Sequence, residues 1–315
     1  MTSTETGVGI EAKSPAIYEL VEEGSAVERV ATGFTFTEGP IWHPDGYLLF
    51  SDMPGDVRRK YTPDKGVEEV MRPSFKCNGM TLDANLDLIV CEHVTSALWR
   101  ERTDGSRELL AYHYEGKYLN SPNDVCVRSD WTIYFSDPWY GRFPGFGIER
   151  GRELGWQGVF RIPPGGGPEE VELVVEKDEF DMPNGLCFSP DESLMYINDT
   201  PRAHIKVWDV NEEGSLSNGR MFFEGVGSGV IEEGIPDGMK CDERGNIWVT
   251  GPGGIWIISA AGEHLGVIKV PENTGNRAGV VTTGTRSSSR ARRRCTRFER
   301  RSARAASRTC ARRSR

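Results

Sequence analysis

The chain has 315 residues, 37% of them hydrophobic, which is enough to bury the core of one or two domains. It has no run of 18 apolar residues, so we expect no transmembrane helix, and the polar residues 1–12 lack the apolar centre of a signal peptide. The net charge of −9 is divided unevenly, and the −22 carried by residues 1–276 argues against a nucleic-acid partner.

The N-terminal residues differ in pattern from the rest. We expect residues 1–15 to form a mobile end. Residues 16–30 alternate apolar and charged side chains and predict a strand that closes a ring of sheets. From Gly33 onward the sequence alternates strand-like runs with turns, and no long stretch has helical periodicity. The predicted folded domain therefore covers residues 16–276.

A repeated pattern organises this domain. Five times an acidic or amide residue follows a short loop and is followed by apolar residues, a polar turn and a strand-like run. We call these five the key residues; they are Glu38, Asn78, Asn123, Asn184 and Asp237, which lie 40, 45, 61 and 53 positions apart. The first strand-like runs after them are 47–50, 88–90, 133–135, 194–197 and 247–249. Second runs follow at 97–100, 159–162, 205–208 and 255–258, and third runs at 108–111 and 171–174.

A β-rich repeat of this length indicates radial or solenoid repetition. Four strands per repeat and about six repeats predict an all-β fold, a six-bladed β-propeller whose blades surround a central channel. A β-sandwich would not explain so long a repeat. The key residues would then start the innermost strands and face one another across the channel.

The C-terminal tail, residues 277–315, breaks the pattern because it contains 14 Arg, no Lys and one Glu. One interpretation is a disordered basic tail. The interpretation that we favour is a frameshift, since Asn276 lies 39 residues after Asp237, where a sixth key residue is due. Read one frame over with suitable codons, the next residues are compatible with a turn and a β-rich run. We therefore expect an incomplete or disordered sixth blade.

Four key residues form a candidate metal site. Glu38, Asn123, Asn184 and Asp237 offer two carboxylates and two amides, an oxygen-rich set with a charge of −2. Such a set suits a divalent cation, Ca²⁺ before Mg²⁺ or Mn²⁺, and the absence of Cys and His from it disfavours Zn²⁺. The alternative is that Asn, Asp and Gly begin strands only because they form good turns.

Other polar and aromatic residues recur near these positions. Four acids, Asp52, Glu92, Asp137 and Asp199, fall 14 or 15 residues after a key residue, and we expect them to end strands and cap loops, with binding of a second cation as the alternative. His93 is interpreted as a hydrogen-bonded structural residue, with proton transfer as the alternative. Trp139 and Tyr140 are candidates for the wall of a substrate pocket, with packing between blades as the alternative.

The motifs around the key residues resemble those of the gluconolactonase / senescence-marker-protein (regucalcin-like) family of six-bladed propeller hydrolases. The matching stretches are 37–40, 119–125, 135–138, 182–186 and 235–239, and the resemblance covers about residues 33–276. It implies a metal-dependent lactonase, with metal bound by Glu38, Asn184 and Asp237. It also implies that Asn123 contacts metal or substrate and that Asp237 acts as general base or nucleophile.

One departure concerns the substrate. Animal sugar-lactone members carry Arg two residues before the position of Asn123, where this chain has Ser121. We therefore expect a small-molecule lactone, with an aldonolactone less certain. The alternatives are a metal-dependent organophosphate triesterase and a non-catalytic propeller that binds protein partners. No Gly-x-Ser-x-Gly motif supports a serine triad. Seven cysteines without short-spaced pairs predict a reduced, cytoplasmic protein, and the oligomeric state stays open.

Overall fold

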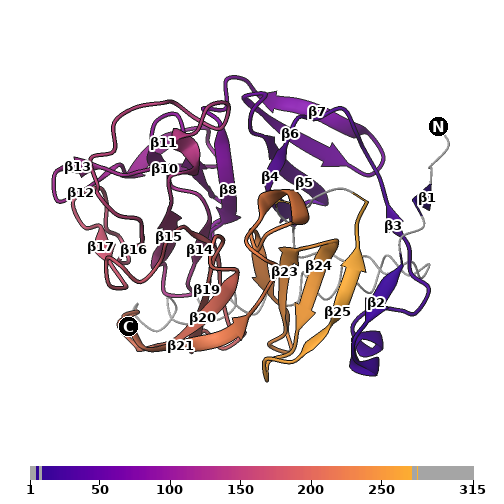
Figure 1. The fold of residues 1–315 in the computed structure, drawn as a ribbon. Coiled ribbons are helices and arrows are strands. Elements are labelled where there is room, and N and C mark those ends of the chain that lie inside the picture. The colour runs from indigo at the N-terminus through magenta and orange to yellow at the C-terminus, as the bar shows by residue number, and fades with distance from the viewer. Residues whose placement is uncertain (1–4, 7–8, 272–274, 276–315) are drawn as a thin grey trace, which may run out of the picture.

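The computed structural model describes residues 5–6, 9–271 and 275. In this part of the chain, five antiparallel sheets stand side by side around a centre as the blades of a propeller (Figure 1). The predicted all-β propeller is thus confirmed. The sixth blade stays a prediction, because the calls on it and on the tail of residues 277–315 lie outside the described residues.

Each blade is a meander whose strands are adjacent in sequence order. Blade 1 consists of β4 (Thr37–His43), β5 (Tyr47–Asp52), β6 (Val57–Thr62) and β7 (Gly66–Met71). Blade 2 consists of β8 (Cys77–Leu82), β9 (Leu88–Glu92), β10 (Ala97–Glu101) and β11 (Arg107–Ala111). Blade 3 consists of β14 (Val125–Val127), β15 (Ile133–Asp137), β16 (Gly158–Ile162) and β17 (Glu172–Leu173). Blade 4 consists of β18 (Pro183–Phe188), β19 (Leu194–Asp199), β20 (His204–Val210) and β21 (Leu216–Glu224).

Blade 5 has an additional strand from the other end of the chain. It consists of β22 (Met239–Cys241), β23 (Ile247–Gly251), β24 (Gly254–Ile258), β25 (His264–Lys269) and β2 (Ile10–Ala12), which pairs with β25. The remaining short elements are β1 (Glu5–Thr6), β3 (Val27–Glu28), β12 (His113–Tyr114), β13 (Lys117–Tyr118) and the 3₁₀ turns η1 (Pro15–Glu19), η2 (Tyr140–Arg142) and η3 (Ile231–Glu233).

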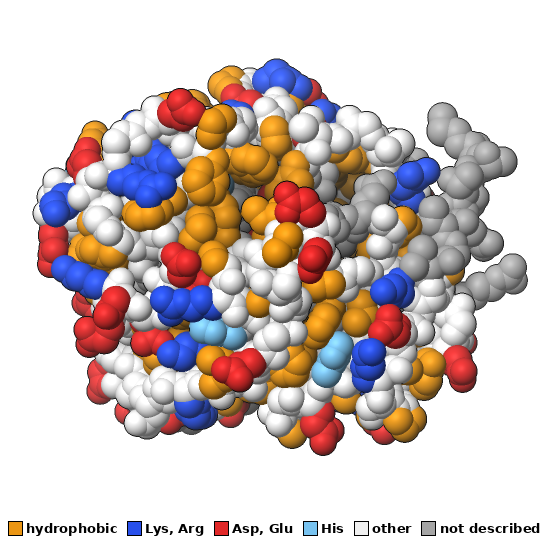
Figure 2. Space-filling model, viewed as in Figure 1, with side chains coloured by type: hydrophobic (Ala, Val, Ile, Leu, Met, Phe, Trp, Pro, Cys, Tyr) orange, Lys and Arg blue, Asp and Glu red, His pale blue; other side chains and the backbone are white. Residues whose placement is uncertain are grey.

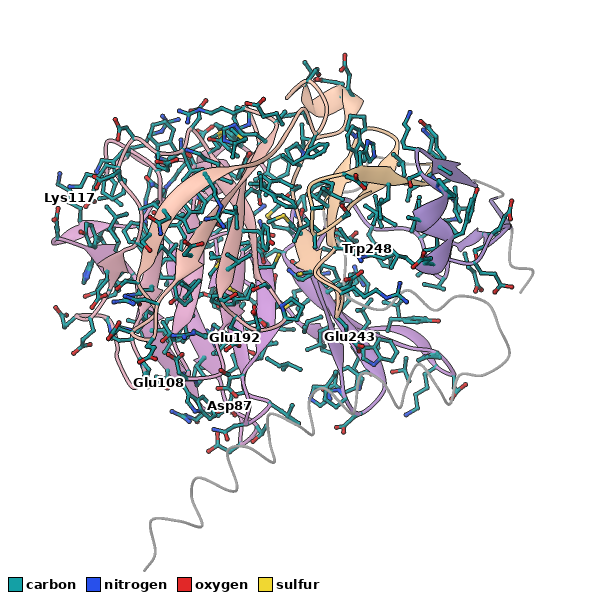
Figure 3. The ribbon with its side chains drawn as sticks, turned by 90° about the horizontal axis from the view of Figure 1, so that it is seen from below. Asp87, Glu108, Lys117, Glu192, Glu243 and Trp248 are labelled. Carbon is teal, nitrogen blue, oxygen red and sulfur yellow. The ribbon has the colours of Figure 1, made fainter. Side chains whose placement is uncertain are left out.

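The hydrophobic core lies between neighbouring blades. Successive residues of a strand point to opposite faces of its sheet, so one strand serves two interfaces. In β15, Phe135 packs with Leu98 of blade 2, whereas its neighbour Tyr134 packs with Met195 of blade 4. In β19, Tyr196 faces blade 5 and packs with Val249. Polar turns also join the blades, as where Glu192 accepts a hydrogen bond from the amide of Ser129 (2.9 Å; Glu192 is labelled in Figure 3).

The predicted strand over residues 16–30 is wrong for residues 16–26; in this range only β3 (Val27–Glu28) is a strand, and it pairs with β1 and not with a blade. Pro15 starts the turn η1 instead, and the hydroxyl of Ser14 accepts a hydrogen bond from the amide of Ala16 (3.3 Å). The turn buries Ile17 against Trp248, on the face of blade 5 that points away from blade 4 (Trp248 is labelled in Figure 3). Burial of the Ile17 side chain therefore decides the local structure, and the alternation of apolar and charged residues does not. The strand that joins the sheet is β2, which lies within the predicted mobile end, residues 1–15.

No helix in the described residues is long and apolar enough to cross a membrane. On the face shown in Figure 2, hydrophobic side chains gather around a hollow that has acidic side chains at its rim.

Candidate active site

The key residues lie where the innermost strands begin. Glu38, Asn78 and Asn184 belong to β4, β8 and β18, and Asn123 and Asp237 lie two residues before β14 and β22. The first four are between 2% and 5% exposed, while Asp237 is half-buried. The propeller therefore brings the start of each inner strand to one buried polar centre.

Three amide side chains of this centre form a hydrogen-bonded chain. Asn78 Nδ2 donates to Asn123 Oδ1 (2.6 Å), and Asn123 Nδ2 donates to Asn184 Oδ1 (2.6 Å). Asn184 Nδ2 then donates to the hydroxyl of Thr200 (3.1 Å), which donates to the carbonyl of Pro236 (2.8 Å). The chain links blades 2, 3, 4 and 5, so the predicted convergence of these side chains occurs.

The residue that follows each key residue allows the backbones of neighbouring blades to approach closely. It is Gly in four repeats, and a Cβ on Gly39 would lie 1.9 Å from the carbonyl oxygen of Asn78. In blade 3 this residue is Asp124, whose Oδ2 lies 3.6 Å from Nζ of Lys240 in blade 5. The sequence analysis missed this ion pair. The sequence did contain a signal for it, because position 124 is the one place where the residue after a key residue is an acid and not Gly.

The two acids of the centre affect each other. Burial raises the pKa of Asp237 well above its usual range, and the negative charge of Glu38 raises that pKa further. Gly275 lies next to Glu38 and to the residue after Asp237: the amide of Gly238 donates to the Gly275 carbonyl (2.9 Å), and a Cβ on Gly275 would lie 2.6 Å from Glu38 Oε1. A bound divalent cation would compensate the negative charges of the buried Glu38 and the half-buried Asp237.

The donor set fits an oxygen-binding cation better than zinc. Among the described residues, no group of three or more His, Cys, Asp or Glu side chains is arranged to hold a metal. The centre instead combines the carboxylates of Glu38 and Asp237 with amide oxygens of Asn123 and Asn184. Hard cations such as Ca²⁺ accept this mixture of ligands and complete their shell with water.

The acids at the ends of the second strands position these residues. Asp137 accepts hydrogen bonds from the amides of Asn120 and Ser121 (2.8 Å each), in the loop that leads to Asn123. Asp52 accepts a hydrogen bond from the amide of Thr35 (2.9 Å), three residues before Glu38 in the chain. Likewise, Asp199 binds the amide of Asp181 (2.7 Å) ahead of Asn184. The predicted capping role is thus observed in blades 1, 3 and 4.

In blade 2 the corresponding acid, Glu92, has other partners. It accepts a hydrogen bond from Thr95 (2.8 Å) and forms an ion pair with Arg107.

Tyr140 and Trp139 are placed differently, although they are neighbours in sequence. The hydroxyl of Tyr140 is buried near Thr200 and Asn184, and burial raises its pKa. No hydrogen bond to this hydroxyl forms within the described residues. Trp139 instead donates from Nε1 to Asn120 Oδ1 (2.6 Å), and the guanidinium of Arg152 covers its ring at 3.2 Å. The contacts thus place Tyr140 at the centre and Trp139 in the supporting loop.

Ser121, the departure from the family pattern, is part of the same support. Its side chain is fully buried; its hydroxyl donates to the carbonyl of Pro138 (2.5 Å) and accepts from the amide of Gly141 (2.9 Å). A Cβ on Gly141 would lie 2.5 Å from Cβ of Ser121 and 2.7 Å from Cγ of His93. The η2 turn therefore fills the space beside position 121, so Ser121 holds the loop rather than substrate.

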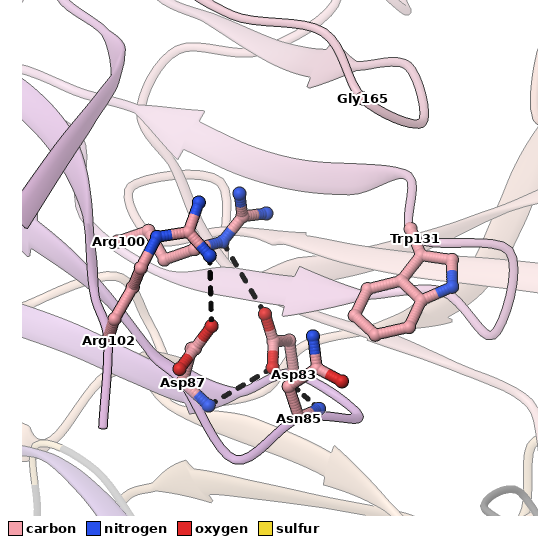
Figure 4. Close-up of a pocket in the computed structure, with 7 residues that line it drawn as sticks. All are labelled: Asp83, Asn85, Asp87, Arg100, Arg102, Trp131 and Gly165. Carbon is pink, nitrogen blue, oxygen red and sulfur yellow. Dashed lines mark hydrogen bonds and ion pairs between the residues drawn. The ribbon is translucent and has the colours of Figure 1, made fainter. Parts of the chain in front are cut away.

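A cavity of about 250 Å³ lies elsewhere, between blades 2 and 3 (Figure 4). It is lined by Asp83, Asn85, Asp87, Arg100, Arg102, Trp131 and Gly165. Its acids already have partners: Asp83 pairs with Arg100 (3.4 Å) and Asp87 with Arg102 (3.5 Å). Asp83 also accepts hydrogen bonds from the amides of Asn85 and Asp87, which closes the turn. No key residue lines this cavity, so it is separate from the candidate site.

Comparison with known proteins agrees with this architecture. A family described as the SMP-30/gluconolactonase/LRE-like region matches residues 36–284. A gluconolactonase from Zymomonas mobilis is 31% identical over 274 residues, covering 81% of this chain and 75% of the relative. A pentonolactonase from Haloferax volcanii is 26% identical and covers 77% of this chain and 76% of the relative.

Solved structures give the same result. A gluconolactonase from Xanthomonas campestris superimposes with a TM-score of 0.77 at 30% identity, covering 88% of this chain and 91% of that structure. A calcium-binding protein, regucalcin, from Agrobacterium tumefaciens has a TM-score of 0.63 at 19% identity, covering 79% and 80% of the two chains. The second likeness shows the fold alone.

Proposed function

Because the chain belongs to the SMP-30/gluconolactonase/LRE-like family, we propose that it is a lactonase that binds a divalent cation and opens a ring ester. The observation that carries this proposal is the convergence of Glu38, Asn123, Asn184 and Asp237 at one buried centre, beside the unsatisfied hydroxyl of Tyr140. A protein-binding scaffold would have no need for two carboxylates that share such a position.

Glu38, Asn123, Asn184 and Asp237 would hold the cation. When bound, it polarises the lactone carbonyl toward attack. Ca²⁺ is the cation that we propose, because every donor is an oxygen and the carboxylates balance its charge.

Asp237 is the proposed general base. As a carboxylate at the proposed cation site, it can take a proton from the attacking water. The water oxygen bonds to the carbonyl carbon, the ring C–O bond breaks, and the proton on Asp237 passes to the leaving ring oxygen. Tyr140 is the proposed substrate donor, since its hydroxyl lies at the centre near Thr200 and Asn184 and could donate to an ester oxygen. The product is a hydroxy acid, and all atoms of water are retained in it.

The proposed substrates are γ- and δ-lactones, because a ring holds the ester in its less stable conformation. Relatives named gluconolactonase and pentonolactonase make sugar lactones the first compounds to test. Ser121 offers no cationic side chain to hold their hydroxyl groups. We therefore propose weaker binding of polyhydroxylated lactones than in members that carry Arg at this position.

The test is hydrolysis of a substrate panel by purified protein, before and after treatment with a chelator. We expect γ- and δ-lactones to be hydrolysed faster than linear esters, with activity lost on chelation and restored by Ca²⁺. Full activity after chelation would refute the metal dependence. A panel in which a paraoxon-like triester outruns every lactone would instead favour an organophosphate triesterase.

We also propose a cytoplasmic location. The support is that four cysteines within the described residues, Cys77, Cys91, Cys126 and Cys187, have free thiols, as a reducing compartment would maintain.

A further inference from the structure

A buried histidine lies at one end of the chain of asparagine side chains. His93 is fully buried at the end of β9 in blade 2. Its Nδ1 lies 2.9 Å from the carbonyl oxygen of Phe146, and its Nε2 lies 3.3 Å from Nδ2 of Asn78. The residue therefore contacts both the loop after η2 and the first amide of the chain.

These contacts determine the tautomer of His93. A backbone carbonyl oxygen can only accept a hydrogen bond, so Nδ1 must carry a hydrogen. The amide nitrogen of Asn78 lies 3.3 Å from Nε2 and can only donate, so Nε2 accepts from it and carries no hydrogen. The ring of His93 is therefore neutral, with its one hydrogen on Nδ1.

The other end of the chain is fixed in the same way. The hydroxyl of Thr200 donates its one hydrogen to the carbonyl of Pro236 (2.8 Å), so it must accept from Asn184 Nδ2. Between the two ends, each amide oxygen receives the NH₂ group of the preceding residue. Carbonyl groups at both ends thus select one direction for the entire chain.

We propose that His93 is a positioning residue that fixes the amide orientation of Asn78 and, through it, of Asn123 and Asn184. With that orientation, the oxygens of Asn123 and Asn184 each accept one hydrogen bond and keep a second lone pair for another partner. A reversed amide would place an NH₂ group where a cation needs an oxygen. This inference rests on the proposed metal site for its functional consequence, while the orientation itself can be tested separately.

The surroundings keep His93 in place. A Cβ on Gly141 would lie 2.7 Å from Cγ of His93, so the η2 turn packs directly against the ring. The same turn carries Tyr140. His93 therefore connects the loop that offers the proposed substrate donor to the amides that would hold the cation.

The first experiment measures the tautomer of His93 in the wild-type protein. Nitrogen-15 NMR of histidine-labelled protein distinguishes a ring protonated at Nδ1 from one protonated at Nε2, and loss of the signal in His93→Gln assigns it. We expect a neutral ring with hydrogen on Nδ1. A hydrogen on Nε2 would overturn the inference, whether or not the protein binds a cation. Failure of the wild-type protein to bind Ca²⁺ would refute the proposed function, and the tautomer would still decide the orientation.

The second experiment measures Ca²⁺ binding by calorimetry. His93→Met keeps a similar volume but removes the acceptor, and we expect a loss of affinity on the order of 10- to 100-fold, as for other residues that orient metal ligands. His93→Gln keeps an acceptor for Asn78 and should retain most of the affinity. His264→Gln removes a histidine that stacks on Trp256 in blade 5 and serves as the matched control.

A double variant tests the route. If His93 acts through Asn78, adding His93→Met to Asn78→Ala should cause no further loss of Ca²⁺ affinity. Additive losses, or a His93→Met protein that binds Ca²⁺ like the wild type, would overturn the inference. If thermal melting shows that His93→Met does not fold, two other measurements decide the question. A hydrogen on Nε2 of His93, or a His93→Gln protein that loses most of the Ca²⁺ affinity of the wild type, would overturn the inference.

Discussion

Replacing Gly141 with Ala should damage activity more than stability. The new methyl carbon would lie 2.5 Å from Cβ of Ser121 and 2.7 Å from Cγ of His93. Non-bonded carbon atoms pack at about 3.5–4.0 Å, so the η2 turn must move by roughly 1 Å. Neither neighbour can retreat, because Ser121 and His93 are both fully buried.

The size of each effect follows from this displacement. Overpacking of a buried site costs about 1–3 kcal/mol, which corresponds to a melting temperature lower by on the order of 2–10 °C in a chain of this size. Tyr140 moves with the turn, and a misplacement of about 1 Å at a reacting centre costs on the order of 10²-fold in rate. We therefore expect a folded protein with kcat/KM for lactones reduced about 100-fold.

The assay compares Gly141→Ala with Gly151→Ala by thermal melting and lactone hydrolysis. Gly151 is the matched control, since no atom lies within 4 Å of a Cβ built there. The control should melt and react like the wild type. A Gly141→Ala protein with unchanged melting and full activity would show that the turn does not press on Ser121 and His93 as described.

Three further predictions concern single carboxylates. Glu38→Gln removes a charged ligand and should weaken Ca²⁺ binding by on the order of 10-fold or more in calorimetry; unchanged affinity would remove Glu38 from the site. Asp237→Asn keeps an oxygen for the cation but no base, so turnover of cation-loaded protein should fall on the order of 10²-fold; undiminished turnover would exclude that role. Burial raises the pKa of Asp137 from 3.8 to about 7, so its contribution to stability is present below pH 4 and is lost as the pH rises through 7. The melting temperature of Asp137→Asn should lack this decline, and parallel pH profiles for variant and wild type would contradict the shift.

The strands of the propeller were predictable from the sequence. The runs 47–50, 194–197 and 247–249 lie within β5, β19 and β23, and the second runs lie within β10, β16, β20 and β24. Alternating side chains and turn residues act over a few positions, so they identify strands and hairpins without any knowledge of distant contacts. The same local signals failed for residues 16–26, where burial of Ile17 against Trp248 is a long-range effect.

The candidate site was likewise predictable in part from local sequence signals and in part only from long-range contacts. The sequence by itself determined which residues start the inner strands, because each follows a turn at the same place in a repeat. Only the tertiary structure decided which atoms they present to one another. The direction of the amide chain, the buried hydroxyl of Tyr140 and the pairing of Asp124 with Lys240 join residues from different blades. These contacts depend on side-chain geometry between segments that are far apart in the chain, which no local pattern encodes.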